Sequence, residues 1–443
     1  MRGRLRHLRS HPDDREIAQL ALPAFGALIA EPLYILTDTA IVGHLGTPQL
    51  GGLAVASGVL LTLYAVFIVL AYGTTAAVSR LLGAGHTREA AHQAVQSMWL
   101  AAGIGLAVGA LGYVLSDALV DAIGADGSVR TNALVYLRIS LLGVPAILLV
   151  MAGTGYLRGV KDTRTPLAVA LGTALLNLGI EVVLIYGLDR GIGASALATV
   201  LAQNAAAGVY LQQVLRAARQ QGAALAPDAA SIRKLAVVGR DLLIRTAALR
   251  AALVVTTTVA TRIGPVDVAA HEVAFQVWSF LGLGLDAIAI AGQAIVGHAL
   301  GAGDGEAARS AGRRMIEWGV AAGVVSGLAV AVSRSALPHL FSGDAEVVAL
   351  AGFLLVWVAA LQPVNAVAFV LDGVLIGAGD MRFLAWAMAG AAAVFVPAAL
   401  AVLATGAGIG WLWAALGLLM TTRAATLLAR FASDRWIVLG AIR

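Results

Sequence analysis

The chain of 443 residues contains no cysteine, which excludes disulfides, thiolate metal sites and thiol nucleophiles. Charged residues are scarce as well: they make up 12% of the sequence, whereas a soluble domain carries about 25%. The eight histidines lie mainly in loops or near the ends of apolar runs, with no HExxH-type spacing. An enzyme embedded in a membrane would need a nucleophile or metal set inside those runs. We therefore expect no enzyme, no resident metal and no cofactor.

Apolar residues dominate the sequence. They make up 60% of the chain, and the mean hydropathy is +0.87. Runs of roughly 20 apolar residues are typical of transmembrane helices, and the alternation expected of a membrane β-barrel is not seen. The sequence predicts an all-α membrane protein with twelve transmembrane helices. The predicted spans are residues 17–43, 52–77, 94–116, 131–156, 166–187, 192–214, 241–262, 268–295, 315–336, 347–374, 383–404 and 410–430.

Two loops of the chain repeat each other. Residues 157–167 read LRGVKDTRTPL and residues 375–385 read LIGAGDMRFLA, so leucine, glycine, aspartate and arginine recur in the same order. The same spacing relates Gly83–Gly85 to Gly301–Gly303. Chance likeness between alanine-rich and glycine-rich segments would not keep one spacing over separate loops. We expect two pseudo-symmetric lobes of six helices each, a parallel repeat with the substrate path between the lobes.

Charge sets the predicted topology. Lysine and arginine gather at one set of helix ends, while the opposite ends carry only Arg130, Arg190, Arg262 and Arg334. By the positive-inside rule both termini lie in the cytoplasm, and the protein is a multi-pass protein of the cell membrane. The pI of about 9.8 then reflects topology and no nucleic-acid partner. The predicted organisation is a basic cytoplasmic leader (1–15), an N-lobe (16–215), a cytoplasmic linker (216–240), a C-lobe (241–430) and a cytoplasmic tail (431–443).

Ionisable and polar residues inside the predicted N-lobe spans are candidates for function, because charge in a bilayer is costly. Asp38 lies well inside the first span, and Glu31 precedes it by two helical turns. Asn177 and Glu181 are four residues apart in the fifth span and share a face, and Thr199 lies in the sixth. Such oxygens suit a small cation, and a desolvated carboxyl suits proton uptake and release.

A structural ion pair is the alternative for these carboxylates, with Arg138 as the partner. The repeat favours function, because the positions equivalent to Asp38, Asn177, Glu181 and Thr199 carry different side chains. These are Thr256, Phe395, Ala399 and Gly417. The loops are duplicated and the polar set is not, so we interpret the set as an ion site of the N-lobe.

The C-lobe has acidic residues of its own. Asp372 and Asp286 are candidates for a second acidic site, and Asp286 also suits a structural pair with an arginine of the seventh span. Candidates for lining a substrate cavity are Glu31, Phe275, Trp278 and Phe369, with core or lipid-facing packing as the alternative for the aromatic residues. Prolines inside spans should kink or break them; they are Pro32, Pro145, Pro363 and Pro397.

The quoted motifs resemble one family over nearly the whole chain. Residues 31–54 (EPLYILTDTAIVGHLGTPQLGGLA), the LRGVKDTRTPL loop and its GAGDMR echo are similar to the multidrug and toxic compound extrusion (MATE) family. Residues 369–380 (FVLDGVLIGAGD) are similar to its DinF-like branch. The resemblance implies twelve helices in two lobes that open alternately to each side. It also implies export of organic, often cationic or amphipathic compounds against an inward flow of H⁺ or Na⁺.

The resemblance implies roles for particular residues. The cation site of the family's N-lobe falls on Asp38, Asn177, Glu181 and Thr199, where Glu181 replaces the usual aspartate. The acidic site that another branch has in its C-lobe falls on Asn365, which is not acidic. We expect H⁺ rather than Na⁺ as the coupling ion, because two carboxyls in one apolar lobe disfavour double ionisation.

Two other transport classes remain open. A lipid-linked sugar flippase of the same superfold would need a cationic central cavity, for which only Arg245 and Arg250 give a hint. A channel would need a filter loop and usually an oligomer. For the antiporter we expect a monomer whose partners are the lipid bilayer and small organic substrates.

Overall fold

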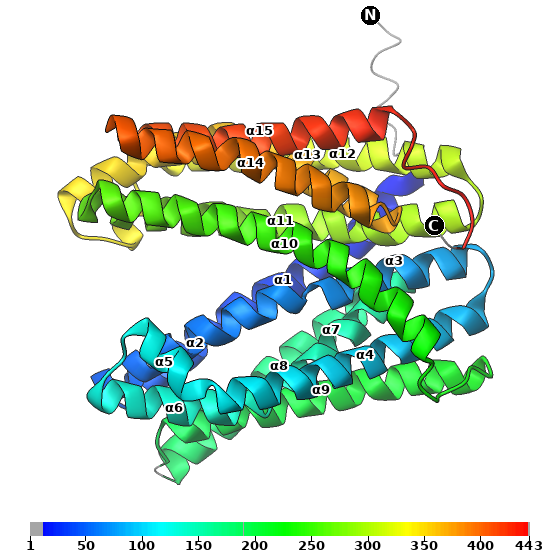
Figure 1. The fold of residues 1–443 in the computed structure, drawn as a ribbon, viewed down its shortest axis with the longest axis horizontal. Coiled ribbons are helices and arrows are strands. Elements are labelled where there is room, and N and C mark those ends of the chain that lie inside the picture. The colour runs from blue at the N-terminus through cyan, green and yellow to red at the C-terminus, as the bar shows by residue number, and fades with distance from the viewer. Residues whose placement is uncertain (1–11, 189, 442–443) are drawn as a thin grey trace, which may run out of the picture. The chain divides into compact units, whose positions relative to one another are not determined.

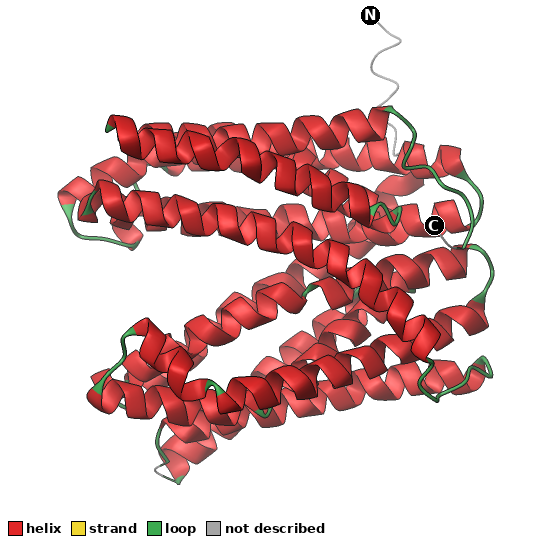
Figure 2. Cartoon of the chain, in the orientation of Figure 1, coloured by secondary structure: helices red, strands yellow, loops and turns green. Residues whose placement is uncertain are grey.

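The computed structural model describes residues 12–188 and 190–441. Residues 1–11, most of the predicted leader, and the last two residues of the predicted tail lie outside the described residues. Within the described ranges every regular element is a helix and no strand occurs (Figure 2). The predicted all-α class is confirmed.

Helices follow one another with short connections (Figure 1). The first half contains α1 (Pro12–Gly43), α2 (Thr47–Phe67), α3 (Val69–Gly83), α4 (Thr87–Val114), α5 (Ser116–Ile123), α6 (Gly127–Leu141), α7 (Val144–Gly159), α8 (Arg164–Val182), the π-helical turn η2 (Val183–Gly187) and α9 (Ile192–Gln220). The second half contains α10 (Ala229–Ile263), α11 (Pro265–Gly301), α12 (Gly305–Ser333), the 3-10 turn η3 (Leu337–Leu340), α13 (Ala345–Gly377), α14 (Met381–Thr405) and α15 (Ile409–Ala432).

Twelve spans emerge from these helices. Eleven helical segments, with α2 and α3 counted as one, are long and apolar enough to cross a membrane. The pair α6 and α7 bends by 49° and passes the same test as one broken span. The predicted twelve-helix membrane fold is therefore confirmed, and the predicted span 131–156 is this broken pair.

Only one of the four prolines within spans coincides with a break. Pro145 lies in the first turn of α7, directly after the break that ends α6. Its ring has no N–H to donate and clashes with the preceding turn, which explains the end of α6. The helices are not broken at Pro32, Pro363 and Pro397, which lie inside α1, α13 and α14. Neighbouring groups in a packed helical membrane protein can accommodate the carbonyls that proline frees.

The two halves repeat a close helix crossing. A Cβ atom on Gly155 of α7 would lie 2.5 Å from the Ala71 carbonyl oxygen of α3. A Cβ atom on Gly373 of α13 would lie 2.3 Å from the Ala289 carbonyl oxygen of α11. Both pairs are related by the spacing of the sequence repeat. Glycine is required at each crossing because the backbones approach too closely for any side chain.

The duplicated loop motifs encode the same helix ending. The Asp162 N–H donates to the Leu157 carbonyl at 2.8 Å, and the Asp380 N–H donates to the Leu375 carbonyl at 2.9 Å. The residue before each aspartate has a positive φ, 62° in the first half and 74° in the second. This is the Schellman arrangement that ends a helix in a left-handed residue. The repeat therefore conserves turn chemistry as well as helix packing.

The chain packs as two compact units. One is Gly26–Gly239, and the other is the described part of Met1–Phe25 together with Arg240–Arg443. Each unit has its own apolar core: the first is contributed mainly by α2, α4, α6, α7 and α9, and the second by α10, α11, α13, α14 and α15. The first turns of α1 thus group with the second half, and the first turns of α10 group with the first half.

The predicted linker, residues 216–240, is mostly helical. Helix α9 continues to Gln220 and α10 begins at Ala229, so that only residues 221–228 connect them. Arginine, lysine and glutamine are good helix formers, and polar sequence next to a span can therefore extend its helix.

Candidate functional site

Asp38 is buried on α1 among hydroxyl groups. The Ser195 hydroxyl of α9 donates to its Oδ1 at 2.7 Å, and the Tyr136 hydroxyl of α6 donates to its Oδ2 at 3.3 Å. Only 6% of Asp38 is exposed. Three helices therefore converge on one carboxylate.

Glu181 lies beside this carboxylate. It is fully buried on α8 and is a neighbour of Asp38 and Ser195. Its Oε2 receives one long hydrogen bond, from Asn177 Nδ2 at 3.4 Å. Its Oε1 and the Asn177 Oδ1 are buried without a hydrogen-bond partner among the described residues. Buried polar atoms are rarely left unsatisfied, so this pair of oxygens is suited to a proton or a small cation.

Thr199 joins the same group of residues. Its hydroxyl is 2.7 Å from the Tyr34 hydroxyl of α1. Ser195, Thr199 and Gln203 follow one another at intervals of four, so they line one face of α9. We call Tyr34, Asp38, Tyr136, Asn177, Glu181, Ser195 and Thr199 the carboxylate cluster. All seven belong to the same compact unit.

The structure brings together the four residues predicted for the ion site and adds three that the sequence interpretation missed. Tyr34 and Ser195 had a usable signal, because each lies one helical turn before a predicted residue, Asp38 or Thr199. Tyr136 had none, because it is 98 residues away from Asp38 in the chain and meets it only in the folded structure. Glu31 is exposed on α1, whereas Asp38 on the same helix is buried.

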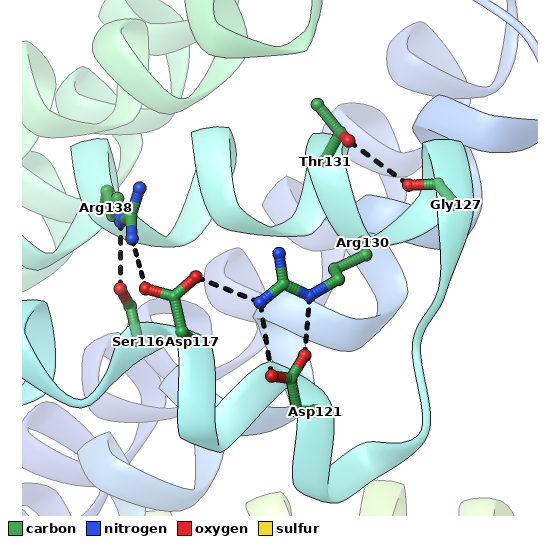
Figure 3. A network of polar contacts seen from close by, with 7 residues as sticks. All are labelled: Ser116, Asp117, Asp121, Gly127, Arg130, Thr131 and Arg138. Atoms are coloured by element: carbon green, nitrogen blue, oxygen red, sulfur yellow. Dashed lines mark hydrogen bonds and ion pairs between the residues drawn. The ribbon is translucent and has the colours of Figure 1, made fainter.

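Arg138 does not pair with either carboxylate of the cluster. Its Nη2 donates to Asp117 of α5 at 2.5 Å and its Nε donates to Ser116 at 2.9 Å (Figure 3). The other oxygen of Asp117 accepts from Arg130 at 3.0 Å. Across the part of the chain that the structure describes, no basic side chain pairs with Asp38 or Glu181. The interpretation of these carboxylates as structural partners of Arg138 is wrong.

Asp372 is the centre of an ion-paired group in the second half. It is buried on α13, and its Oδ2 accepts from both Arg245 of α10 and Arg423 of α15. The Arg423 guanidinium also lies 5.3 Å from the centre of the Phe369 ring. A carboxylate held between two guanidinium groups ties three helices together, which favours a structural role over a second ion site.

The other candidates of the second half lie in different surroundings. Asp286 is half-buried on α11. Trp278 is buried in the core of its unit, and its ring lies 5.5 Å from that of Phe275. Core packing, the alternative for the aromatic candidates, is what the structure shows for Trp278.

Among the described residues of the second half, the carboxylate cluster has no counterpart. Thr256, at the position equivalent to Asp38, donates its hydroxyl to its own helix at 2.9 Å. Phe395 and Ala399, equivalent to Asn177 and Glu181, are fully buried in the apolar core. The polar set is thus confined to one half, as the sequence predicts.

A family model described as MatE matches residues 23–183 and 247–403. The chain belongs to the MatE family. The two matched stretches correspond to the two halves of the repeat, and the recognition of the family from sequence motifs is confirmed. The protein is a multi-pass membrane protein of a family of multidrug efflux transporters.

Individual MatE relatives resemble the chain over most of its length. It is 30% identical over 390 residues to DNA damage-inducible protein F of Escherichia coli K12, covering 86% of this chain and 84% of that protein. It is 32% identical over 389 residues to the chloroplastic protein DETOXIFICATION 44 of Arabidopsis thaliana, covering 84% and 74% respectively.

Solved structures of MatE proteins share the fold. The bent form of the transporter VcmN of Vibrio cholerae matches with a TM-score of 0.87 at 18% identity, covering 95% of this chain and 96% of that one. An outward-facing MATE transporter of the MOP superfamily matches with a TM-score of 0.86 at 20% identity, covering 97% and 98%. These likenesses confirm the two-lobe, twelve-helix architecture.

Proposed function

We propose that this MatE protein exports organic, often cationic or amphipathic compounds by alternating access, driven by inward movement of H⁺ through the carboxylate cluster. The observation that carries the proposal is the juxtaposition of Asp38 and Glu181, two buried carboxylates that pair with no basic side chain in the described ranges. Two adjacent permanent charges among apolar spans are too costly to keep without a use. An ion that enters and leaves the cluster provides that use.

The geometry supports a proton as the coupling ion. Asp38 accepts two hydroxyl donors, whereas Glu181 has one long amide contact and one oxygen without a donor. Two adjacent carboxyls disfavour double ionisation, so a single proton satisfies the pair. The oxygens of Asp38, Asn177, Glu181 and Thr199 are also the ligand type that Na⁺ takes, which makes Na⁺ the alternative to test.

Purified protein in proteoliposomes distinguishes the two ions. Export of a fluorescent organic cation is followed once under a pH gradient in Na⁺-free buffer and once under a Na⁺ gradient with the pH clamped. We expect the pH gradient alone to drive export and the variant Asp38→Asn to abolish it. Export driven by Na⁺ alone, with no response to the pH gradient, would show that the ion is wrong.

The flippase alternative is tested by the same measurement, because gradient-driven export of a dye is not a flippase activity. The two arginines that hinted at a cationic cavity are accounted for differently: Arg245 pairs with Asp372, and Arg250 is exposed. No contact in the described structure specifically favours a pyrophosphate-linked substrate.

The proposal includes a location and a state. Because basic residues gather at the helix ends that carry the termini, we place both termini in the cytoplasm and the protein in the cell membrane. We also propose that it works as a monomer, since the carboxylate cluster is complete within one unit of one chain.

A further inference from the structure

The segment that enters α10 is bound along one face of α4. Gln96 of α4 is fully buried, donates from Nε2 to the Ala226 carbonyl at 2.9 Å and accepts from the Asp228 N–H at 2.8 Å. Trp99, on the same side of α4, donates from Nε1 to the Leu225 carbonyl at 2.9 Å. Both ends of the Gln96 amide are therefore used to hold main-chain groups of the connection.

The same segment sets the first residue of α10. Asp228 accepts from the N–H groups of Ala230 and Ser231 at 3.1 and 3.3 Å, and from the Ser231 hydroxyl at 2.5 Å. These hydrogen bonds, that of the hydroxyl first, hold the pKa of Asp228 below its usual range. His92, one turn before Gln96, lies 3.2 Å from the Ala224 carbonyl. An N-cap that is itself bound by α4 fixes where α10 begins.

The first turn of α1 is held in a comparable way by α12. Arg314 donates from Nε and Nη2 to the two carboxylate oxygens of Asp14, at 2.6 and 2.9 Å. Trp318 donates from Nε1 to Asp14 Oδ1 at 2.9 Å. Glu317 accepts from Arg314 Nη1 at 2.5 Å, which fixes the guanidinium. Bidentate pairs of this kind are geometrically specific as well as strong.

The two contacts are related by the repeat. Gln96 and Arg314 are separated by the same spacing as Leu157 and Leu375, and α4 and α12 are equivalent helices. In each case an indole three or four residues later donates to the same entering segment. The side chains differ, an amide in one half and a guanidinium in the other, yet both bind the start of a helix that opens a half.

We infer that Gln96 and Arg314 form a reciprocal pair of positioning residues, each of which anchors the start of the helix that opens the other half of the chain, and that both anchors are required for transport. The anchors themselves stand on the contacts above. The requirement for transport rests on the proposed function.

Both α1 and α10 begin in one compact unit and continue into the other, so that each anchor holds a helix that the two units share. Asp14 groups with the second half, whereas Asp38, further along α1, lies in the first. At 1.5 Å per residue roughly 36 Å of helix joins the anchored carboxylate to the carboxylate cluster. Directly before α10 the anchored Asp228 groups with the first half, and further along α10 Arg245 pairs with Asp372 in the second. A helix held at one end carries the position of that end along its axis, to Asp38 of the carboxylate cluster in α1 and to the structural Arg245–Asp372 pair in α10.

Hydrogen exchange of the full chain in lipid nanodiscs tests the anchors directly. The variant Gln96→Leu should raise exchange of the amides of residues 223–229 on the order of tenfold and leave those of residues 15–19 unchanged. The variant Arg314→Met should raise exchange of the amides of residues 15–19 and leave those of residues 223–229 unchanged. The milder variant Asp14→Asn, at a partly exposed site, should act in the same direction as Arg314→Met. Combining Asp14→Arg with Arg314→Asp should restore slow exchange.

Matched controls come from the same helices. Gln93 lies three residues before Gln96 on α4, and Arg313 directly precedes Arg314 on α12. Their side chains make no hydrogen bond or ion pair among the described residues, so Gln93→Leu and Arg313→Met should change exchange in neither segment.

Export by the same variants tests the requirement for transport. Loss of at least about fivefold in export rate by both anchor variants, with both controls at the wild-type rate, supports the inference. Unchanged exchange in Gln96→Leu or Arg314→Met overturns the anchors, and faster exchange with unchanged export overturns the requirement. A wild-type protein that exports nothing under either gradient contradicts the proposed function, while the exchange measurements still decide the anchors.

Discussion

A buried carboxylate usually has a cationic partner, and Asp38 has hydroxyl partners instead. Ser195 and Tyr136 solvate it without cancelling its charge. The second carboxylate, Glu181, lies next to it. We propose that an ion enters and leaves this pair of carboxylates, which is the property a coupled transporter needs.

The variant Asp38→Asn removes the charge and keeps the shape of the side chain. We expect it to abolish gradient-driven export while the protein still inserts into the membrane at normal abundance, because the helix packing is unchanged. Dye export from proteoliposomes and the amount of membrane-inserted protein check this. Glu272→Gln, which removes an exposed carboxylate of α11, is the control and should export normally. Wild-type export by Asp38→Asn would rule out Asp38 as the coupling residue.

The variant Ser195→Ala removes the shortest hydrogen bond to Asp38. Leaving one oxygen of a buried carboxylate without its donor costs about 1–3 kcal/mol, so we expect export to slow by roughly 5- to 150-fold. Initial rates of dye export at several substrate concentrations measure it. Ser326→Ala is the control, because that hydroxyl bonds only within its own helix. Equal rates for Ser195→Ala and the wild type would show that this hydrogen bond has no part in coupling.

Part of the cluster was predictable from sequence. Asp38 and Glu181 stand out because carboxylates are rare in apolar spans, and spacing of four residues links Asn177 to Glu181. Tyr136 was not predictable, since its approach to Asp38 depends on tertiary packing. The arginine partners of Asp372 were likewise hidden, because they come from helices distant in sequence.

At the scale of helices, glycine sets how closely the elements approach. The variant Gly373→Val would place a Cβ atom within 2.3 Å of the Ala289 carbonyl oxygen, where only backbone movement relieves the clash. Overpacking of this kind costs about 1–3 kcal/mol or more. We expect a lower melting temperature and less folded protein, measured by fluorescence-detected size exclusion after heating. Gly390→Val is the control, because no atom lies within 4 Å of a Cβ there. Equal stability of the two variants would contradict the close crossing.

Helix boundaries show where sequence reasoning on elements stops. Long apolar runs predicted the spans, and the duplicated loops predicted where helices end. The break at Pro145 and the continuity at Pro363 and Pro397 look alike in sequence, because each is a proline within an apolar run. The surroundings of each helix decide whether proline ends it.

The short helix α5 is tied to α6 by a network of ion pairs outside the long apolar helices (Figure 3). Hydrogen bonds from Arg130 hold the pKa of Asp121 below its usual range. Because the pKa of Asp121 is lower in the folded protein, its ion pair stabilises the fold above the ordinary aspartate pKa. This stabilisation is lost as pH falls through the lowered pKa of the folded protein. We expect protection of the amides of 119–124, corrected for intrinsic exchange, to stay constant from pH 7 to 5.

The matched variant Arg130→Gln removes the guanidinium that binds Asp121. We expect it to lose protection of the amides of 119–124 already at pH 7. Protection that falls between pH 7 and 5 in the wild type would contradict the role of Asp121.

For the whole molecule, the sequence repeat predicted two lobes. The structure adds that the boundaries of the two compact units differ from those of the two halves of the sequence. The first turns of α1 and α10 each group with the half to which they do not belong in sequence. The repeat could not reveal this, because equivalent residues such as Gln96 and Arg314 differ in type. What is conserved is the place of an anchor on the helix, and the chemistry that fills it depends on the segment to be bound.

The orientation of the molecule in its membrane follows from charge and is open to a direct test. The segment 221–228 lies at the helix ends where arginine and lysine gather, whereas Asp126 is exposed at the opposite ends, next to α6. Because the chain has no cysteine, single thiols can be introduced by Leu225→Cys and Asp126→Cys. An impermeant maleimide added to intact cells should label the second variant and not the first, and both should react after the cells are permeabilised. Labelling of the first alone in intact cells would invert the topology, and with it the direction of the proposed ion flow.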